Sequence, residues 1–273
     1  MKQRKAKLIY AGGETLAIQK IFRRVEKKYL MTEEQCEALK TAIPAYMNAD
    51  RYGLHTICNV YYDTDQDDLI RASIEKPIYK EKFRLRSYGI PGGEDTVFLE
   101  MKKKYKGMVY KRRVAAPYDR AIEYLSRVTS QAGREETPED RDGLTDSPEG
   151  KQILNEITFM IHRYQLHPRI YIAYDRIAYY GKENPDIRLT IDSNMRFREE
   201  NLNLAAGDAG TPILPEEKYL MEIKIPDAMP LWLTEILTRA KIYPVSFSKY
   251  GTYYSGRRYR QENGGKKNAE SSI

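Results

Sequence analysis

Residues 82–113 alternate polar and apolar side chains at a period of two, which predicts three consecutive β-strands. In the first of them Phe83 and Leu85 alternate with three cations, and successive strand side chains point to opposite faces. The alternation recurs at 99–104 and 111–114, and Pro-Gly-Gly and Lys-Gly steps supply the turns between strands. The stretch holds ten lysines and arginines against three acids. It therefore predicts an antiparallel meander with one basic face.

The same period predicts further strands at 22–30, 54–63, 169–180, 187–197 and 218–225. Strands and helices do not alternate regularly, and no glycine-rich phosphate loop is present, which argues against a doubly wound parallel sheet. We expect an α+β fold: an antiparallel, eight-stranded, tunnel-like β-barrel, closed or nearly closed, with flanking helices.

Helical spacing is clearest after Thr32, whose side chain is expected to form a capping box with Gln35. That helix is expected to run to about Ile43 and to end at Pro44. Further helices are expected at about 14–21, 65–73, 119–129, 151–165 and 229–241, and a short helix or turn at 246–256.

The chain is expected to form one domain over 21–256, with polar segments outside the regular elements. Residues 1–20 predict a flexible N-terminal arm, and 257–273 predict a polar C-terminal tail. Within the domain, 133–150 combines seven acids with prolines and glycines, which is typical of a mobile, solvated loop.

Composition favours an anionic partner. The net charge is +7, charged residues make up 31% of the chain, and 23 tyrosines add polarity. Cys36 and Cys58 lack the spacing of a disulfide framework or a zinc site. No run approaches the ~20 apolar residues of a membrane span, so we expect a cytoplasmic protein.

If the sheet closes into a barrel, its charged faces line the interior. Burying unpaired like charges is costly, so such an interior is tolerable only when anions and water fill it. Arginine suits bidentate phosphate contacts, and carboxylates can hold a Mg²⁺ or Mn²⁺ ion that bridges to phosphate. The residues expected to face inward are Arg24, Glu26, Lys28, Lys82, Arg84, Arg86, Glu100, Lys102, Lys111, Arg113, Arg176, Arg188, Asp192, Glu222 and Lys224.

An ordered set of motifs resembles a known family. The pieces are RRVEKKYL, KFRLRSYG, VFLEMKKK followed by VYKRRV, YDRIAYYG, RLTIDSNMRF, YLMEIKI and FSKYGTYYSG. Together they are similar to the catalytic domain of the vacuolar transporter chaperone (VTC) polyphosphate polymerases, within the triphosphate tunnel metalloenzyme (CYTH-like) superfamily. The resemblance covers about residues 20–256. It implies a tunnel that binds a nucleotide triphosphate and transfers its terminal phosphoryl group to a growing chain.

The resemblance also implies roles for individual residues. Glu222 corresponds to the metal-binding carboxylate. The phosphate-binding cations correspond to Lys28, Arg84, Arg86, Lys102, Lys111, Arg176, Lys224 and Lys249. Further contacts to the substrate are expected from Glu26, Lys82, Glu100, Arg113, Arg188 and Asp192.

The chain departs from the pattern of tunnel triphosphatases at its first strand. Those enzymes place two glutamates before a lysine at alternating positions, whereas this chain has Arg24 before Glu26 and Lys28. The loss of one metal ligand favours the polymerase branch over the hydrolases.

The function expected from the resemblance is a polyphosphate polymerase that uses ATP and Mn²⁺ or Mg²⁺. Two alternatives remain: a tunnel triphosphatase that hydrolyses nucleoside triphosphates or tripolyphosphate, and a non-catalytic sensor of polyphosphate or nucleotide. The expected partners are ATP, polyphosphate and a membrane protein that accepts the product, with no nucleic acid.

Several roles stay open at this point. Glu100 and Asp192 could orient arginines or bind metal, Glu222 could merely balance charge, and Arg113 could take the place of Lys111.

Overall fold

The computed structural model describes residues 25–130, 144–214, 216–226 and 228–270, with side chains to residue 259. The expected N-terminal arm, Arg24 and most of the acidic loop therefore lie outside the described residues. Within the expected loop, helix α4 (Pro148–Tyr164) already begins at Pro148.

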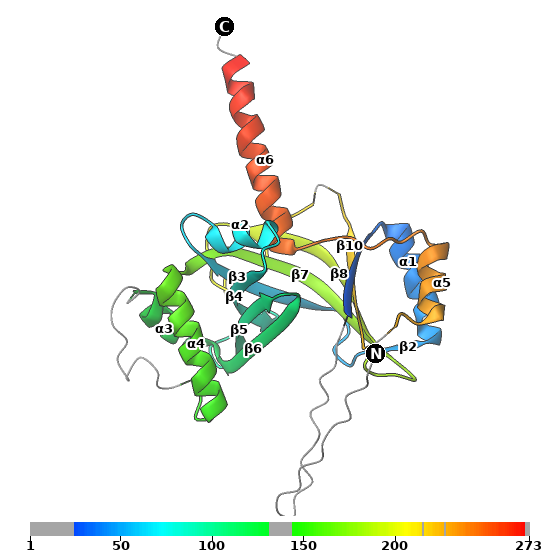
Figure 1. Ribbon diagram of the computed structural model, residues 1–273, viewed down its shortest axis with the longest axis horizontal. Coiled ribbons are helices and arrows are strands. Elements are labelled where there is room, and N and C mark those ends of the chain that lie inside the picture. The colour runs from blue at the N-terminus through cyan, green and yellow to red at the C-terminus, as the bar shows by residue number, and fades with distance from the viewer. Residues whose placement is uncertain (1–24, 131–143, 215, 227, 271–273) are drawn as a thin grey trace, which may run out of the picture.

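One antiparallel sheet organises the chain (Figure 1). Its main path has eight strands in the order β1-β10-β8-β7-β3-β4-β5-β6, which confirms the predicted sheet. The bounds are Val25–Met31 for β1, His55–Asp63 for β3, Tyr79–Tyr88 for β4, Thr96–Tyr105 for β5, Met108–Pro117 for β6, His167–Gly181 for β7, Arg188–Arg198 for β8 and Tyr219–Ile225 for β10.

The sheet curls into a half-barrel. Its path ends at β1 and β6, and these two strands do not pair with each other in the part of the chain that the structure describes. Of the closed or nearly closed barrel that was expected, the structure thus shows the open form. Two short strands were not expected: β2 (Met47–Ala49) pairs with β7, and β9 (Thr211–Pro212) pairs with β8.

Helices cover the outer face in two layers, on opposite sides of the molecule (Figure 1). Helices α3 (Tyr118–Ser130) and α4 pack on the outer side chains of β3–β6, such as Phe83 and Leu99. Helices α1 (Glu33–Ala42) and α5 (Leu231–Arg239) pack on β1, β8 and β10. The predicted capping box of Thr32 and Gln35 is present at the start of α1, and the 3₁₀ turn η1 (Ile43–Ala45) follows.

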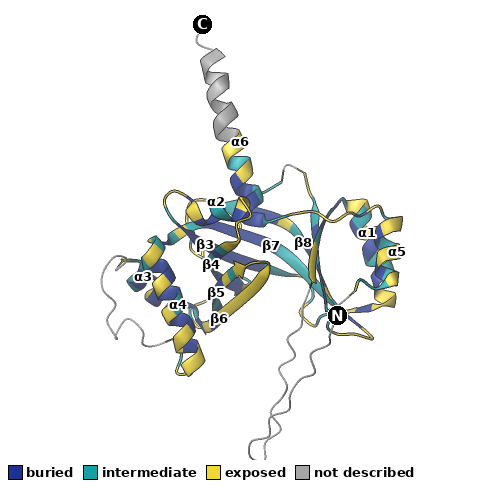
Figure 2. Cartoon of the chain, in the orientation of Figure 1, coloured by how far each residue is buried: buried dark blue, intermediate teal, exposed yellow. Residues whose placement is uncertain are grey.

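Helix α2 (Asp68–Ile74) and the start of helix α6 (Lys249–Glu270) cover one end of the half-barrel. Tyr250, Tyr253 and Tyr254 of α6 pack against inner-face residues such as Ile172 and Leu220. Figure 2 shows the start of α6 buried against the sheet. Helix α6 is longer than the short helix or turn expected at 246–256. The sequence after 256 contains no proline and is rich in good helix formers, but it lacks the apolar face by which a helix is recognised.

Candidate functional site: the basic concave face

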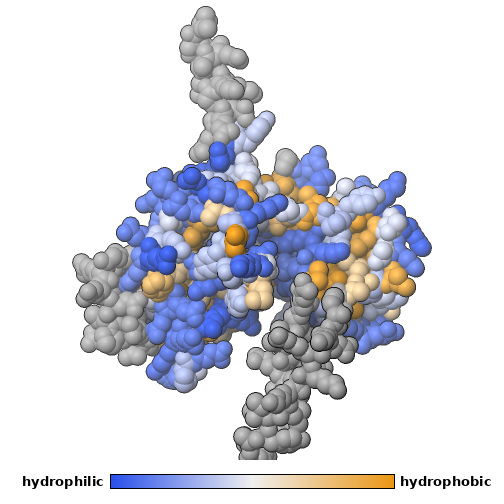
Figure 3. Space-filling view, in the orientation of Figure 1, coloured by the Kyte–Doolittle hydropathy of each residue, from blue (hydrophilic) through white to orange (hydrophobic). Residues whose placement is uncertain are grey.

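The strand register brings the predicted charged residues onto one face. Lys82 pairs with Lys102 and Arg84 with Glu100 between β4 and β5, and Lys102 pairs with Lys111 between β5 and β6. Directly opposed residues share a face, so these side chains line the inside of the curl. Figure 3 shows hydrophilic side chains between the two helical layers on the side turned to the viewer.

The other half of the sheet adds its charges to the same concave face. Lys28 of β1 lies opposite Glu222 of β10, and Arg176 of β7 lies opposite Asp192 of β8. Lys224 pairs with Arg188 and Glu26 nearer the end of the face, where Arg188 is exposed. Lys249 enters from the first position of α6.

Glu100 is the centre of one charge cluster on this face. The Nε and Nη2 of Arg84 donate to Glu100 Oε2 at 2.9 and 2.7 Å, and Lys111 Nζ lies 2.7 Å from Oε1. Although burial alone would raise the pKa of this carboxyl, Arg84, Arg86 and Lys111 lower the pKa to about 2. Glu100 therefore orients cations. Arg113 instead lies over the Phe98 ring, 4.8 Å from its centroid, so Lys111 is the β6 cation that joins the cluster.

Two tyrosines and an asparagine complete this cluster. Arg84 Nη1 donates to the Tyr61 hydroxyl at 2.9 Å, and Arg86 donates to Asn59 Oδ1 at 2.9 Å and to the Tyr174 hydroxyl at 3.3 Å. These three residues were not predicted as site residues. They could have been found in the sequence because they alternate along strands at the period of a sheet face. Tyrosine at such positions, however, more often belongs to the hydrophobic core.

Asp192 is the centre of a second cluster. Arg176 donates two hydrogen bonds to its carboxylate, at 2.5 and 2.7 Å, and Lys249 Nζ donates to Oδ2 at 2.6 Å. The Asp192 side chain is fully buried. Burial alone would raise its pKa, but Lys249 and Arg176 lower the pKa below its usual range. Asp192 thus holds the two cations in place.

Glu222 lies beside this cluster. Lys28 Nζ is 3.0 Å from Oε1, Arg176 Nη2 is 3.6 Å from Oε2, and Lys249 Nζ is 3.8 Å from Oε1. Despite burial, which acts in the opposite direction, Lys249, Lys28 and Arg176 lower the pKa of Glu222. A carboxylate that stays ionised among cations is available to a divalent ion when phosphate takes over those cations.

Four lysines form a row at the end of the face near α2 and α6. The directly opposed pairs are Lys80 with Lys104 and Lys82 with Lys102. In the part of the chain that the structure describes, none of the four has a carboxylate oxygen within 4.0 Å. Opposed like charges destabilise a sheet, so this lysine row is costly without an anion.

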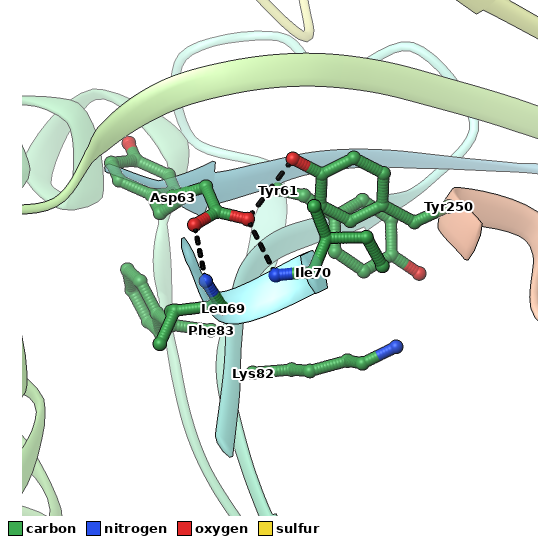
Figure 4. A pocket seen from close by; sticks show the side chains of 8 residues that line it. Tyr61, Asp63, Leu69, Ile70, Lys82, Phe83 and Tyr250 are labelled. Atoms are coloured by element: carbon green, nitrogen blue, oxygen red, sulfur yellow. Dashed lines mark hydrogen bonds between the residues drawn. The ribbon is translucent and has the colours of Figure 1, made fainter. Parts of the chain in front are cut away.

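Helix α6 is fixed beside the lysine row by a buried carboxylate. Asp63 accepts hydrogen bonds from the backbone N–H groups of Leu69 and Ile70 and from the Tyr250 hydroxyl at 3.1 Å (Figure 4). Lys82 Nζ reaches Ser248 Oγ at 3.4 Å. These contacts join α2 to the start of α6 and so help to place Lys249.

Burial and the neighbouring lysines, Lys80 and Lys102 among them, lower the pKa of Lys82 to about 8. Lys82 is therefore charged below that pH, and a bound polyanion raises its pKa by stabilising the charged form. We expect the affinity for long-chain polyphosphate to fall as the pH rises from about 7 to about 9, and binding near pH 8 to take up protons. Calorimetry in buffers of different ionisation enthalpy measures both effects. In Lys82→Arg, which stays charged, the decline should flatten; an equal decline in that variant would assign the titration to another group.

A divalent metal fits this face only together with phosphate. Among the described residues no group of three His, Cys, Asp or Glu side chains could hold a metal ion. Glu222 and Glu26 both lie near Lys28 Nζ, at 3.0 and 3.8 Å. Because Mg²⁺ is usually held by one or two carboxylates plus substrate phosphates, this donor set suits a metal that arrives with a nucleotide.

No helix in the described part of the chain is long and apolar enough to cross a membrane.

Several solved structures are similar to the chain. A Hippeastrum protein described as an adenylyl cyclase with a dominant triphosphatase activity is 16% identical, with 85% of this chain and 96% of that chain covered and a TM-score of 0.49. A Vibrio parahaemolyticus protein assigned as an adenylate cyclase is 11% identical (86% and 98% covered, TM-score 0.42). The mimivirus capping-enzyme triphosphatase is 7% identical (79% and 88% covered, TM-score 0.31).

Family membership rests on the sequence match. No curated protein sequence matches the chain, and the TM-scores above lie below 0.5. The model of the VTC domain, however, matches residues 23–255, which is most of the chain. The chain therefore belongs to the VTC domain family.

Proposed function

We propose that the protein is a metal-dependent polyphosphate polymerase, which transfers the terminal phosphoryl group of ATP to a growing polyphosphate chain on the concave face. The observation that carries the proposal is the excess of cations on one face, which continues beyond the two carboxylate clusters into the lysine row. Three phosphates can be held by the clustered arginines and lysines. The lysine row then offers charge for phosphates of a longer chain.

The state of the carboxylates favours transfer to phosphate over hydrolysis. Hydrolysis gains from a base that accepts a proton from water, and a base works best when its pKa is near the working pH. The pKa values of Glu100, Asp192 and Glu222 are all lowered by neighbouring cations, so these groups are weak bases. A phosphate acceptor is already anionic at neutral pH and needs no such base.

In the proposed reaction the side chains position the phosphates and neutralise their charge, which is most of what phosphoryl transfer requires. Arg84 and Arg86, oriented by Glu100, Tyr61, Asn59 and Tyr174, bind the phosphate chain. Arg176 and Lys249, held by Asp192, face it from the other half of the sheet.

Glu222, with Glu26 near it, would hold the Mn²⁺ or Mg²⁺, which supplies charge stabilisation to the transferring phosphoryl group when bound. Lys28 lies near both carboxylates and would bind a phosphate of the nucleotide there.

The lysine row should bind long chains selectively. We expect Lys80→Gln with Lys104→Gln to weaken binding of long-chain polyphosphate by about tenfold or more, since each lysine forms charge-assisted contacts. Tripolyphosphate affinity should change little. The matched control is Lys27→Gln with Lys151→Gln, two exposed lysines away from the concave face. Fluorescence anisotropy with labelled polyphosphate chains of defined length measures the two affinities. Equal losses of affinity for short and long chains would show that the lysine row does not bind long chains selectively.

The proposed activity is tested by incubating the purified protein with ATP and Mn²⁺ and resolving the products on a gel. A ladder of long phosphate chains is the expected result. Free phosphate without chains would instead identify a triphosphatase. If neither product forms, the protein would be a non-catalytic binder of nucleotide or polyphosphate.

A further inference from the structure

Exposed apolar side chains gather at one end of β4, β5 and β6. Residues 74–79 and 105–110, called the apolar tip below, contribute Ile74, Ile78, Tyr79, Tyr105, Met108, Val109 and Tyr110, each between 41% and 68% exposed. The two segments are neighbours: Tyr79 pairs with Tyr105, and the N–H of Lys106 donates to the carbonyl of Ile78 at 2.9 Å. In Figure 3 apolar atoms stand among hydrophilic ones in this part of the surface. A contiguous exposed patch of this kind is typical of an interaction site.

The charge around the apolar tip is positive. Lys76 and Lys106 lie within the two segments, and no carboxylate oxygen of the described residues lies within 4.0 Å of either ammonium group. Glu75 is the one acid in the two segments. The nearby Lys103 and Arg112 are already paired with Glu156, at 3.2 and 2.5 Å.

We propose that the apolar tip docks on an anionic lipid surface. The tip is the turn of a β-hairpin, at Lys106-Gly107. Tyrosine rings and lysine stems are the side chains that lie at the boundary of a bilayer, with apolar parts inward and polar ends in the headgroups. Ile78 and Met108 supply the apolar area between them.

Charge complementarity favours an anionic lipid surface over a protein as the partner of the apolar tip. Lysines near a membrane surface are attracted by anionic headgroups, whereas lysine is depleted from the buried centres of protein–protein interfaces. The proposed docking does not depend on the proposed activity, because the residues that make it lie outside the concave clusters.

The test is cosedimentation of the full chain with lipid vesicles. We expect binding to phosphatidylcholine vesicles that contain about 30% phosphatidylserine, little binding to pure phosphatidylcholine, and weakening in about 0.5 M salt. The pair Ile78→Ser with Met108→Ser, and separately Lys76→Gln with Lys106→Gln, should each weaken binding by about tenfold. The control pair is Leu231→Ser with Tyr243→Ser, which removes exposed apolar side chains at another place on the surface.

Tripolyphosphate binding by each variant serves as the check that it is folded. The proposal is overturned if the wild-type chain does not bind the anionic vesicles, or if the tip variants bind them as the wild type does. It is also overturned if tripolyphosphate displaces the vesicles, because headgroups then occupy the concave face. A wild-type dimer that Met108→Ser dissociates, without vesicle binding, would make the apolar tip a contact between two copies of the chain.

Discussion

Glu222→Gln should lower the rate of ATP turnover by about a hundredfold or more, because one preorganised group that stabilises transferring charge commonly contributes that much. The substitution keeps the shape of the side chain and removes its charge. Three cations approach the Glu222 carboxylate, and Lys28 Nζ is the nearest of them at 3.0 Å. Higher Mn²⁺ should recover part of the lost turnover, since the remaining carboxylates and phosphates still attract the ion.

ATP binding measured without metal distinguishes a metal-binding role of Glu222 from a role that only balances charge. The variant face is more positive, so metal-free ATP should bind as tightly as to the wild type or more tightly. Glu37→Gln, which removes an exposed partner of Lys40 on α1, is the matched control and should leave turnover unchanged. Full turnover of Glu222→Gln at the wild-type Mn²⁺ optimum would exclude Glu222 from the mechanism.

Asp192→Asn should destabilise the fold strongly in the absence of ligand. The carboxylate is fully buried and holds Arg176 and Lys249 at 2.5 to 2.7 Å. Among the described residues, removing its charge leaves Glu222 as the one carboxylate within 4.0 Å of the two buried cations. Breaking a buried ion pair in this way costs about 3 kcal/mol. Urea unfolding with and without tripolyphosphate measures the effect, and the anion should restore much of the lost stability because it compensates the same cations.

The pH dependence of this effect has a defined sign. The pKa of Asp192 is lower in the folded protein than in the unfolded chain. Its contribution to the free energy of unfolding is therefore fully present above the unfolded pKa, near 4, and is lost as the pH falls through the folded pKa. The stability gap between wild type and Asp192→Asn should therefore narrow below about pH 4. Asp208→Asn is the control, because its partner Arg196 also contacts Asp175 and Asp208 is 40% exposed; a loss there as large as in Asp192→Asn would contradict the account.

Much of the sheet follows from the period of the sequence alone. The alternation around Lys82 and Arg84 predicted both the strands and the face that carries the cations, and the capping box at Thr32 predicted the start of α1. These features are local, so a single segment contains the whole signal. The short strands β2 and β9 carry too few residues to show a period.

The contacts that organise the site could not be predicted in the same way. Asp192 and Lys249 are 57 positions apart, and Asp63 and Tyr250 are 187 positions apart. Their meeting depends on how far the sheet curls and on where α6 packs, which no local pattern encodes. For the same reason the sequence could not decide between a closed and a nearly closed barrel, and in the described part of the chain β1 and β6 end an open path.

The most direct test of the concave face as a triphosphate site is a crystal structure of the protein with Mn²⁺ and a non-hydrolysable ATP analogue. The account predicts the triphosphate between the two clusters, with phosphate oxygens in hydrogen-bond contact with Arg84, Arg86 and Arg176 and the ion on Glu222. An analogue bound elsewhere on the molecule, with both clusters unchanged, would contradict it.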